Sequence, residues 1–463
     1  MGRGDDVARC HRYAERVVAG KVPACSLARD ACERHLRDLA AQPARGLYFD
    51  ERAARHALSF FSYLKHSKGE WAGSTFRLED WQCFIVGSIF GWMRKDGTRR
   101  FRDAYVEVPR KNGKSTLAAG VGLYLFAADD EPGAEVYTAA TKREQARIVH
   151  AEAIRMVRKS RSLRSVIRIR RDNLSLEDTA SKYEPLGADQ GTDEGLNPHG
   201  AIIDELQAHK TSDLVNVLKT ALGARRQPLI FRITTAGHNQ QSVGREEHDH
   251  SEAVLKGTVE DDAWFAFIAT IDKGDDWRTV KAARKANPNY GVSVKPAYLK
   301  DQVAWAANLP SRQAEVECKH FDIWNVSETG WIPLDIWDAS AGTVDPEKLR
   351  GRECYGGLDL ATVSDMTAWV MGFPSEVGRK FGDHVCDEDC VDILARFFCP
   401  EAKLTDSSNR YRDQYQVWAD KGFLTVTPGN ATDYAFVRQQ VIDDAAKFRL
   451  VDMNVDRLFQ AHQ

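Results

Sequence analysis

The sequence predicts an α/β protein with two folded units, the first of them built on a sheet that is mostly parallel. Between residues 104 and 237, apolar runs typical of strands alternate with helical runs, which is the order found in parallel sheets. Residues 104–108 lead through a Gly-Lys-Ser turn into an apolar helical stretch, the usual context of a phosphate-binding loop. Two further strand-like runs begin near residue 354 and open a second α/β unit.

Length and composition agree with a globular protein of several domains. A chain of 463 residues exceeds one ordinary core, and 43% hydrophobic with 28% charged residues is the usual globular balance. The net charge of −3 gives no sign of nucleic-acid binding, so such a role would need a local patch. There is no run of about 18 apolar residues and no signal-peptide core, so we expect neither membrane insertion nor secretion. Nine scattered cysteines indicate reduced thiols.

The chain divides into four expected segments. Residues 1–70 have helical spacing and carry no recognisable chemistry, so we expect an N-terminal helical region. Residues 71–310 contain the alternating strands and helices around the phosphate-like turn. Residues 311–345 are mixed in character and rich in tryptophan, which favours a linker, and residues 346–463 form the second α/β unit.

The stretch "VPRKNGKST", residues 108–116, resembles a Walker A phosphate loop but has Val108 where the first glycine should stand. Gly113 would allow the backbone to turn its N–H groups inward, Lys114 would reach the β- and γ-phosphates, and Ser115 would bind Mg²⁺. Arg110 adds positive charge near the phosphates. The alternative is a basic surface turn that binds nothing.

Three other stretches complete a nucleotide site around this loop. The strand-like run "AIIDEL" ends in Asp204, which would hold Mg²⁺, and Glu205, which would orient or deprotonate the attacking water. The run "ITTAG" contains Thr234 and Thr235, whose hydroxyls could sense the γ-phosphate. Gln82 has an amide that could pair with the adenine edge. Taken singly, an acidic strand end or a lone glutamine means little.

A second acidic set lies in the last hundred or so residues. Asp359 falls in an apolar strand-like run, Asp365 at the following turn, and Asp456 at another strand end. A carboxylate inside an apolar strand is costly unless it is paired or serves a metal. Carboxylates gathered from separate strands hold two Mg²⁺ or Mn²⁺ ions in RNase H-like nucleases. Ordinary acidic strand ends remain the alternative.

Residues 155–171 carry eight arginines or lysines and no acid. Such a run could follow the phosphates of DNA, or it could be a solvated helix face.

These motifs together resemble the large terminase subunits of tailed bacteriophages, the ATP-driven DNA-packaging motors. The resemblance covers nearly the whole chain, and that family often lacks the first Walker A glycine. It implies a P-loop ATPase domain of the additional-strand, catalytic-glutamate type, followed by an RNase H-like nuclease domain. It rests on the order and spacing of "WQCFIVGSIFGW", "VPRKNGKSTLAAG", "AATKREQARIV", "GLNPHGAIIDELQAH", "ITTAG", "CKHFDIWN" and "GGLDLATVSDMTA".

The resemblance implies a role for each matching residue. ATP and its Mg²⁺ would be bound by the set Gln82, Arg110, Gly113, Lys114, Ser115, Thr116, Asp204, Thr234 and Thr235, with Ser115 and Asp204 as metal ligands. Glu205 would be the catalytic glutamate. At the nuclease site, Asp359 and Asp456 would bind Mg²⁺ or Mn²⁺, with Asp365 close by. Family members carry a third acidic ligand well downstream of the position of Asp456, but this chain stops seven residues after Asp456. We therefore expect the nuclease domain to be C-terminally incomplete.

The resemblance also implies partners and a setting. These are double-stranded DNA, a small terminase subunit, the portal protein of the prohead and a homo-oligomeric ring, in the cytoplasm of an infected or prophage-carrying bacterium. An arginine from a neighbouring subunit usually completes such ATP sites, and the candidates are Arg143, Arg147, Arg225 and Arg226. Two other functions stay open, a P-loop helicase or repair ATPase, and a degenerate prophage protein that only binds partners.

Overall fold

The computed structural model describes residues 5–42, 44–140, 142–187, 195–209, 212–325, 337, 340, 342–361, 366–381, 384–387, 390–406, 409 and 412–455. The chain forms two compact units, Met1–Asp335 and Ile336–Gln463. Among the helices of the described ranges, none is both long enough and apolar enough to span a bilayer.

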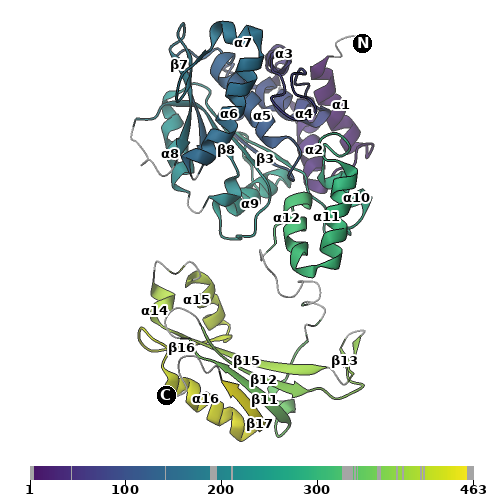
Figure 1. Ribbon diagram of the computed structural model, residues 1–463, viewed down its shortest axis with the longest axis vertical. Coiled ribbons are helices and arrows are strands. Elements are labelled where there is room, and N and C mark those ends of the chain that lie inside the picture. Colours follow the sequence, from purple (N-terminus) through teal and green to yellow (C-terminus); the bar gives the residue numbers. More distant parts are fainter. Residues whose placement is uncertain are drawn as a thin grey trace. The chain divides into compact units, whose positions relative to one another are not determined.

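The first unit is organised around an eight-stranded sheet (Figure 1). The first six strands in spatial order are parallel, and the last two are antiparallel additions at one edge. One strand, β9, lies between β3, which precedes the phosphate loop, and β8, which ends in Asp204. In spatial order the strands are β10 (Trp264–Ile268), β3 (Asp103–Glu107), β9 (Leu229–Thr234), β8 (Pro198–Asp204), β4 (Glu135–Ala140), β7 (Ser181–Gly187), β6 (Leu174–Leu176) and β5 (Arg168–Ile169).

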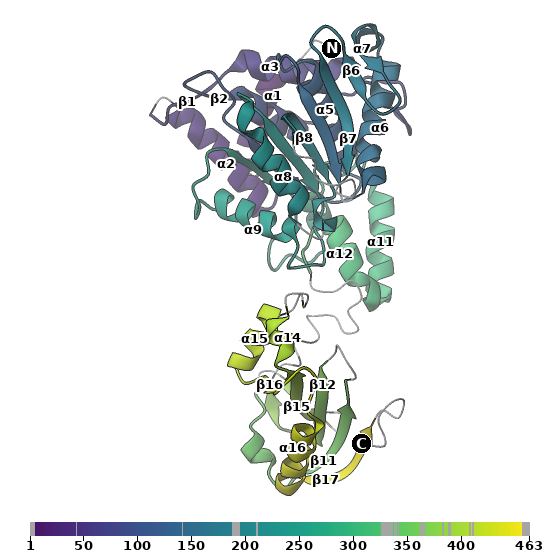
Figure 2. The same ribbon diagram turned by 90° about the vertical axis from the view of Figure 1, so that its left-hand side faces the viewer.

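Helices cover both faces of this sheet (Figures 1 and 2). On one face lie α5 (Lys114–Ala127) and α6 (Arg143–Lys159), followed by α7 (Arg161–Val166), and on the other lie α8 (Asp213–Ala221) and α9 (Val243–Leu255). The small residues of α5 allow close packing, because a Cβ at Gly122 would lie 2.5 Å from the Tyr183 hydroxyl and one at Gly120 would lie 2.5 Å from the Phe61 ring. Connections between parallel strands cross over in the right-handed sense. Connections on one face of the sheet therefore add strands in one direction along it, and connections on the other face add strands in the opposite direction.

The N-terminal helices share one hydrophobic core with the sheet. A Cβ at Gly87 would lie 2.9 Å from the Cys10 sulfur, and one at Gly91 would lie 2.6 Å from the Phe49 ring, so glycines in α4 let the neighbouring segments approach. The segment expected as an N-terminal helical region therefore packs as part of the first unit. Its elements are α1 (Asp6–Val18), α2 (Ser26–Ala41), β1 (Leu47–Phe49), α3 (Glu51–Phe60), η1 (Phe61–Tyr63), α4 (Asp80–Gly91) and β2 (Trp92–Arg94).

Three helices after β10 form a small core of their own in the first unit. They are α10 (Val280–Ala286), α11 (Pro296–Asn308) and α12 (Gln313–Phe321). Trp277, Val316 and Phe321 are buried in this core. The helix α12 lies within residues 311–345, which the sequence suggested as a linker, and its buried side chains explain why this part of the stretch is folded.

The second unit has a five-stranded mixed sheet (Figure 1). Strands β11, β12 and β15 form an antiparallel meander, and β16 and β17 pair in parallel at the two edges, an order that agrees with the RNase H-like fold. The helix α16 (Tyr434–Lys447) packs on one face with Val437, against Trp369 and Phe373. In spatial order the strands are β16 (Leu424–Thr427), β15 (Val391–Pro400), β12 (Thr367–Pro374), β11 (Glu353–Asp359) and β17 (Arg449–Val455). A separate hairpin consists of β13 (Lys380–Phe381) and β14 (His384–Val385), and the unit also contains the short helices α14 (Ala402–Thr405) and α15 (Arg412–Asp420).

Candidate active sites

The phosphate loop joins the carboxyl end of β3 to the amino end of α5. Gly113 is the residue before α5 and has a φ of 83°, a left-handed conformation that glycine adopts without strain. Lys111 is also left-handed, with a φ of 71°. Val108, at the place of the missing first glycine, is fully buried. The loop therefore anchors the Val108 side chain in the core and turns tightly at Gly113.

Lys114 points back into the loop rather than out to solvent. Its Nζ donates hydrogen bonds to the carbonyl oxygens of Val108 (2.9 Å) and Pro109 (3.2 Å), and also to the Thr235 hydroxyl. Burial lowers the pKa of the Lys114 amine, although the nearby carboxylates of Asp322 and Asp204 act in the opposite direction. A buried amine at the amino end of a helix is well suited to an anionic ligand such as a phosphate.

Asp204, the last residue of β8, faces the first turn of α5. The Ser115 hydroxyl donates to Asp204 Oδ2 across 3.2 Å, and the backbone N–H of Glu205 donates to Asp204 Oδ1 across 3.0 Å. Burial and the neighbouring charge of Glu205 raise the pKa of Asp204 to about 6. A carboxylate and a hydroxyl are oxygen ligands of the kind that Mg²⁺ prefers, and a cation would relieve the poor solvation of Asp204. These residues therefore fit a magnesium ion.

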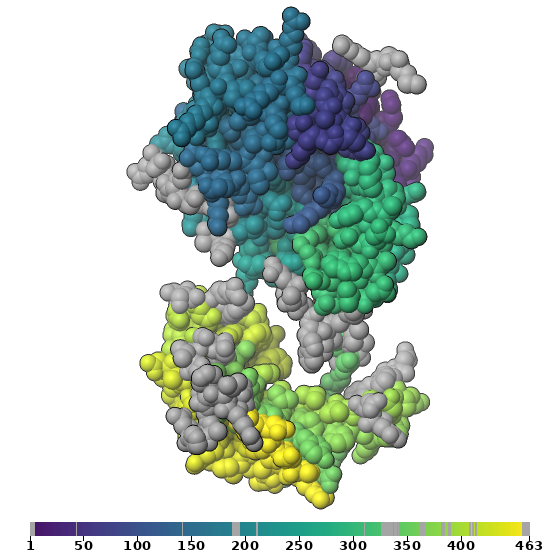
Figure 3. All heavy atoms as spheres, in the orientation of Figure 1, coloured from purple at the N-terminus to yellow at the C-terminus, as the bar shows by residue number. Residues whose placement is uncertain are grey.

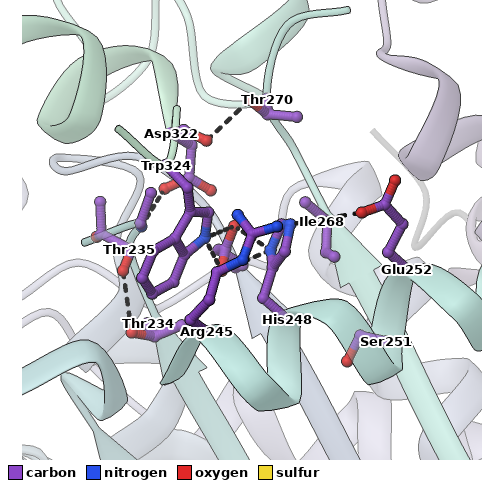
Figure 4. Close-up of polar contacts among 12 residues, drawn as sticks. Thr234, Thr235, Arg245, His248, Ser251, Glu252, Ile268, Thr270, Asp322 and Trp324 are labelled. Carbon is purple, nitrogen blue, oxygen red and sulfur yellow. Dashed lines mark hydrogen bonds and ion pairs between the residues drawn. The ribbon is translucent and has the colours of Figure 1, made fainter. Parts of the chain in front are cut away.

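Glu205 is held in a left-handed conformation, with a φ of 56°. The Gln207 side chain donates to Glu205 Oε2 (2.6 Å), and the same side chain accepts a hydrogen bond from the Thr234 hydroxyl. Thr234 thus contacts the group that orients Glu205, whereas Thr235 contacts Lys114; Figure 4 shows the two threonines side by side. The sequence did not predict a role for Gln207, because a glutamine close to an acidic strand end matches no known motif.

Two asparagines far along the chain support the phosphate loop. Asn112 donates to Asn287 Oδ1 (2.9 Å), and its own Oδ1 accepts from the backbone N–H of Asn289 (3.0 Å). Asn289 Oδ1 in turn accepts from Trp81 Nε1 (2.7 Å). The sequence analysis missed this support, since the residues lie in the small α10–α12 core and no local pattern relates them to the loop.

The other residues that the sequence predicts to bind the nucleotide lie in or beside the same loop. The Gln82 side-chain oxygen accepts from the Glu79 backbone N–H (3.0 Å) and caps α4, while its Nε2 lies 3.8 Å from where a Cβ would stand at Gly113. Arg110 has an exposed side chain, and its backbone N–H donates to the Lys319 carbonyl of α12 (2.8 Å). Thr116 is half-buried in the first turn of α5. Gln82 thus touches the loop while part of its amide is already used within α4.

The four candidate arginines lie in different places. Arg225 donates to the carbonyls of Gly133 (2.6 Å) and Asn197 (3.2 Å), which precede β4 and β8, so it lies at the sheet edge opposite the phosphate loop. Arg226 donates to the Asp96 carbonyl (2.9 Å). Arg143 begins α6, just after the carboxyl end of β4, on the edge that carries the phosphate loop. Arg147 pairs with Asp172 at 3.5 Å.

In the second unit, Asp359 is the last residue of β11 and is exposed. The cost of burying a carboxylate, invoked from the sequence, therefore does not apply to Asp359, because the strand ends there. Leu358 pairs with Val455 in the parallel strand β17, so the carboxyl ends of these strands lie at one edge of the sheet. Asp365 and Asp456 fall outside the described residues. The sequence analysis also missed Asp444, which is fully buried and accepts two hydrogen bonds from Arg396 (2.6 and 2.7 Å).

The fold and the first site define a P-loop ATPase of the additional-strand, catalytic-glutamate type joined to an RNase H-like unit, since β9 lies between the loop strand and the strand that ends in Asp204-Glu205. Family models described as the terminase large subunit ATPase domain and endonuclease domain match residues 80–253 and 258–458. The chain belongs to the large terminase subunits of tailed bacteriophages.

Individual relatives agree with this family. Protein YmfN of Escherichia coli K12 is 31% identical over 252 residues, which are 53% of this chain and 54% of YmfN, so the chain spans about half of that relative. The terminase large subunit of Enterobacteria phage HK97 is 25% identical over 403 residues, 84% of this chain and 74% of that protein. The crystal structure of the HK97 large terminase matches with a TM-score of 0.51, 25% identity, and coverage of 87% and 80% of the two chains.

The endonuclease family model and the compact units divide the chain differently. That model begins at residue 258, whereas β10 and the helices α10–α12 fold with the first unit. Asn287 and Asn289 come from this region and brace the phosphate loop. Residues that the endonuclease family model covers thus support the phosphate loop of the first unit.

Proposed function

We propose that the protein is a DNA-packaging motor subunit that couples ATP hydrolysis to the movement of double-stranded DNA and cuts that DNA with a metal-dependent nuclease unit. The observation that carries the proposal is the convergence of Lys114, Ser115, Asp204 and the Gln207-held Glu205 at one sheet edge, with Thr234 and Thr235 between them. This arrangement supports a site that binds ATP with Mg²⁺ and positions a water molecule.

Each residue has a distinct part in this mechanism. Lys114 would exchange its bonds to the loop carbonyls for bonds to the β- and γ-phosphates of ATP. Ser115 and Asp204 would hold Mg²⁺, which neutralises phosphate charge when bound. Glu205 would orient the attacking water and accept its proton, with Gln207 keeping the carboxylate in place. Loss of the γ-phosphate would then change the contacts of Thr234 with Gln207 and of Thr235 with Lys114.

Two substitutions test the ATPase. Lys114→Ala and Glu205→Gln should each lower the rate of Mg²⁺-dependent ATP hydrolysis by at least about a hundredfold, because one removes phosphate binding and the other the general base. The matched control is Lys300→Ala, an exposed lysine of α11, which should keep the wild-type rate. Normal hydrolysis by either site variant would exclude this ATP site. Unwinding of a forked duplex by the wild type would favour a helicase instead.

The surface formed by α6, α7 and the strand β5, which belongs to the blue region of the first unit in Figure 3, is the proposed contact for DNA. Arg155 is tied to the buried Glu152 at 2.7 Å. Seven other cationic side chains between residues 158 and 171 are exposed, and one of them, Arg170, pairs with Glu177 at 2.6 Å. Cations without interspersed acids follow a phosphate backbone with little regard to base sequence. The exposed set is Arg158, Lys159, Arg161, Arg164, Arg168, Arg170 and Arg171.

Salt dependence tests this surface. Replacing Arg161 and Arg164 together by alanine should weaken duplex binding and reduce the slope of log K against log salt by about one for each phosphate that the variant no longer neutralises. The double variant Arg29→Ala with Arg37→Ala, on exposed positions of α2, is the matched control. Equal slopes in the two double variants would exclude the basic surface as the DNA-binding face.

The nuclease half of the proposal rests on the family and on the exposed Asp359 at the strand edge. In a version that carries the complete nuclease domain, Asp359→Ala should abolish Mg²⁺- or Mn²⁺-dependent cutting of a plasmid, whereas Glu353→Ala, at the exposed start of the same strand, should not. Cutting that survives in Asp359→Ala would remove Asp359 from the metal site. The ring, the small terminase subunit and the portal are the partners that this function implies.

A further inference from the structure

We propose that Asp322 is a positioning residue for the ATP site, where its carboxyl group donates a hydrogen bond to Glu107 and holds the chain just beyond Thr235. The inference rests on the proposed ATPase function. It adds a buried pair of carboxyl groups, Glu107 and Asp322, to that site. Neither residue belongs to the phosphate loop or to the acidic end of β8.

Asp322 is fixed at the junction of three segments (Figure 4). It follows α12, is only 2% exposed, and has a left-handed φ of 60°. Its Oδ1 accepts a hydrogen bond from the backbone N–H of Ala236 (2.8 Å), and the Thr270 hydroxyl donates to its carbonyl oxygen (2.9 Å). Ala236 follows Thr235, whose hydroxyl holds Lys114. Asp322 thus holds the residue that directly follows Thr235, the threonine that Lys114 contacts.

Glu107, the last residue of β3, is the acidic neighbour of Asp322 and is fully buried. It accepts hydrogen bonds from His248 Nδ1 (3.0 Å), from Trp324 Nε1 (3.2 Å) and from the Tyr105 hydroxyl. Burial acts against ionisation, but His248 and these donors together lower the pKa of Glu107, and Glu107 in return raises the pKa of His248. The Glu107 carboxyl group and the His248 ring are therefore a tightly coupled buried pair, 3.0 Å apart.

Two carboxylates in one buried site repel each other, so each disfavours the ionisation of the other. Burial, followed by the charge of Glu107, raises the pKa of Asp322 well above its ordinary value, although the amine of Lys114 acts in the opposite direction. Asp322 is therefore the neutral partner. Its Oδ1 accepts from Ala236, and its Oδ2 is a buried oxygen to which no described residue donates. As a neutral carboxyl group, Asp322 can donate its proton from Oδ2 to Glu107, which gives this oxygen a partner without adding a buried charge.

This arrangement makes a specific demand on substitutions at position 322. Asparagine has the same pattern, an oxygen that accepts and a nitrogen that donates, and it carries no charge. Alanine has neither, and it leaves the Ala236 N–H and one Glu107 lone pair without partners. If the negative charge of Asp322 were needed, asparagine would fail as badly as alanine. The two variants therefore separate a hydrogen-bonding role from a charge role.

The experiment compares the wild type, Asp322→Asn and Asp322→Ala. We measure kcat for ATP hydrolysis and the Kd of a fluorescent ADP, which reports the loop without the γ-phosphate. Asp322→Asn should stay within about threefold of the wild-type kcat, and Asp322→Ala should fall by about tenfold or more, since small displacements of catalytic groups have such effects. Both variants should bind ADP within about threefold of the wild type, because neither touches the nucleotide.

Several outcomes would overturn the inference. One is a loss of kcat in Asp322→Asn equal to that in Asp322→Ala, and another is a wild-type kcat in Asp322→Ala. Should Asp322→Ala fail to fold, Asp322→Asn still decides, because a folded variant that binds ADP but no longer hydrolyses ATP contradicts the proposed role. Absence of hydrolysis in the wild type would instead refute the ATPase function itself, so the two failures are distinguishable.

Discussion

Replacing Asp204 by asparagine should stabilise the first unit while it abolishes ATP hydrolysis. Burial and the adjacent Glu205 charge raise the pKa of Asp204 from 3.8 to about 6. A carboxyl group with a raised pKa binds its proton more tightly in the folded chain than in the unfolded chain. Its stabilising contribution is complete below about pH 4 and is lost as the pH rises through about 6.

The size of the effect follows from these two pKa values. One pKa unit corresponds to about 1.4 kcal/mol, so the ionisation of Asp204 lowers the free energy of unfolding by about 3 kcal/mol at pH 8. At pH 5 the loss is about half as large, because the unfolded chain has ionised at this residue and the folded chain mostly has not. Asparagine is neutral at both values, so the variant should gain up to these amounts, or roughly 2–6 °C in Tm at pH 8.

Calorimetry in EDTA at pH 8 and pH 5 measures this difference without a competing cation. Glu260→Gln removes one negative charge at an exposed loop position and should leave Tm unchanged at both pH values. Steady-state hydrolysis at pH 8 with Mg²⁺ should show that Asp204→Asn is inactive. The reasoning fails if Asp204→Asn melts at the wild-type temperature at pH 8, or if its gain is as large at pH 5 as at pH 8.

Three further substitutions probe other parts of the molecule. Gly113→Ala should lower kcat/KM for ATP and destabilise the first unit by about 1 kcal/mol, since the φ of 83° strains any residue with a Cβ; unchanged kinetics would contradict this role. Asn289→Ala leaves the buried Trp81 N–H without its acceptor and releases the loop, so KM for ATP should rise in steady-state assays while Lys300→Ala keeps the wild-type value. Asp444→Ala strips Arg396 of its partner and should destabilise the second unit by roughly 3 kcal/mol, with ATP hydrolysis unaffected; a calorimetric trace identical to the wild type would refute the importance of this pair.

The nucleotide site could be predicted from the sequence to the extent that its signals are local. The strand, the turn at Gly113 and the helix that begins with Lys114 are adjacent in the chain, and the run that ends in Asp204 carries its own apolar pattern. The structure brings the Ser115 hydroxyl within 3.2 Å of Asp204, so these two predicted Mg²⁺ ligands lie side by side. At Asp359 the sequence suggested a carboxylate inside a strand, but the strand ends at that residue and leaves its side chain exposed.

The supports of the site could not be predicted in the same way. Asn112 is separated from Asn287 by 175 residues, and the stretch around Asn287 has no motif. Glu107 appeared as an ordinary strand residue, and Asp322 fell in a stretch expected to be a linker. Their contacts depend on burial, which places His248 against the Glu107 carboxyl group and raises the pKa of Asp322.

The sequence by itself determined the α/β class, the phosphate loop and the family, because strand and helix periods and short motifs are written in neighbouring residues. Only the tertiary structure decided that β9 lies between β3 and β8, and that Thr234 and Thr235 therefore reach Gln207 on one side and Lys114 on the other. Strand order depends on which apolar faces pack together across the whole chain, and no local stretch contains that information. Hydrogen bonds between distant residues exist only once that packing has removed water from around them.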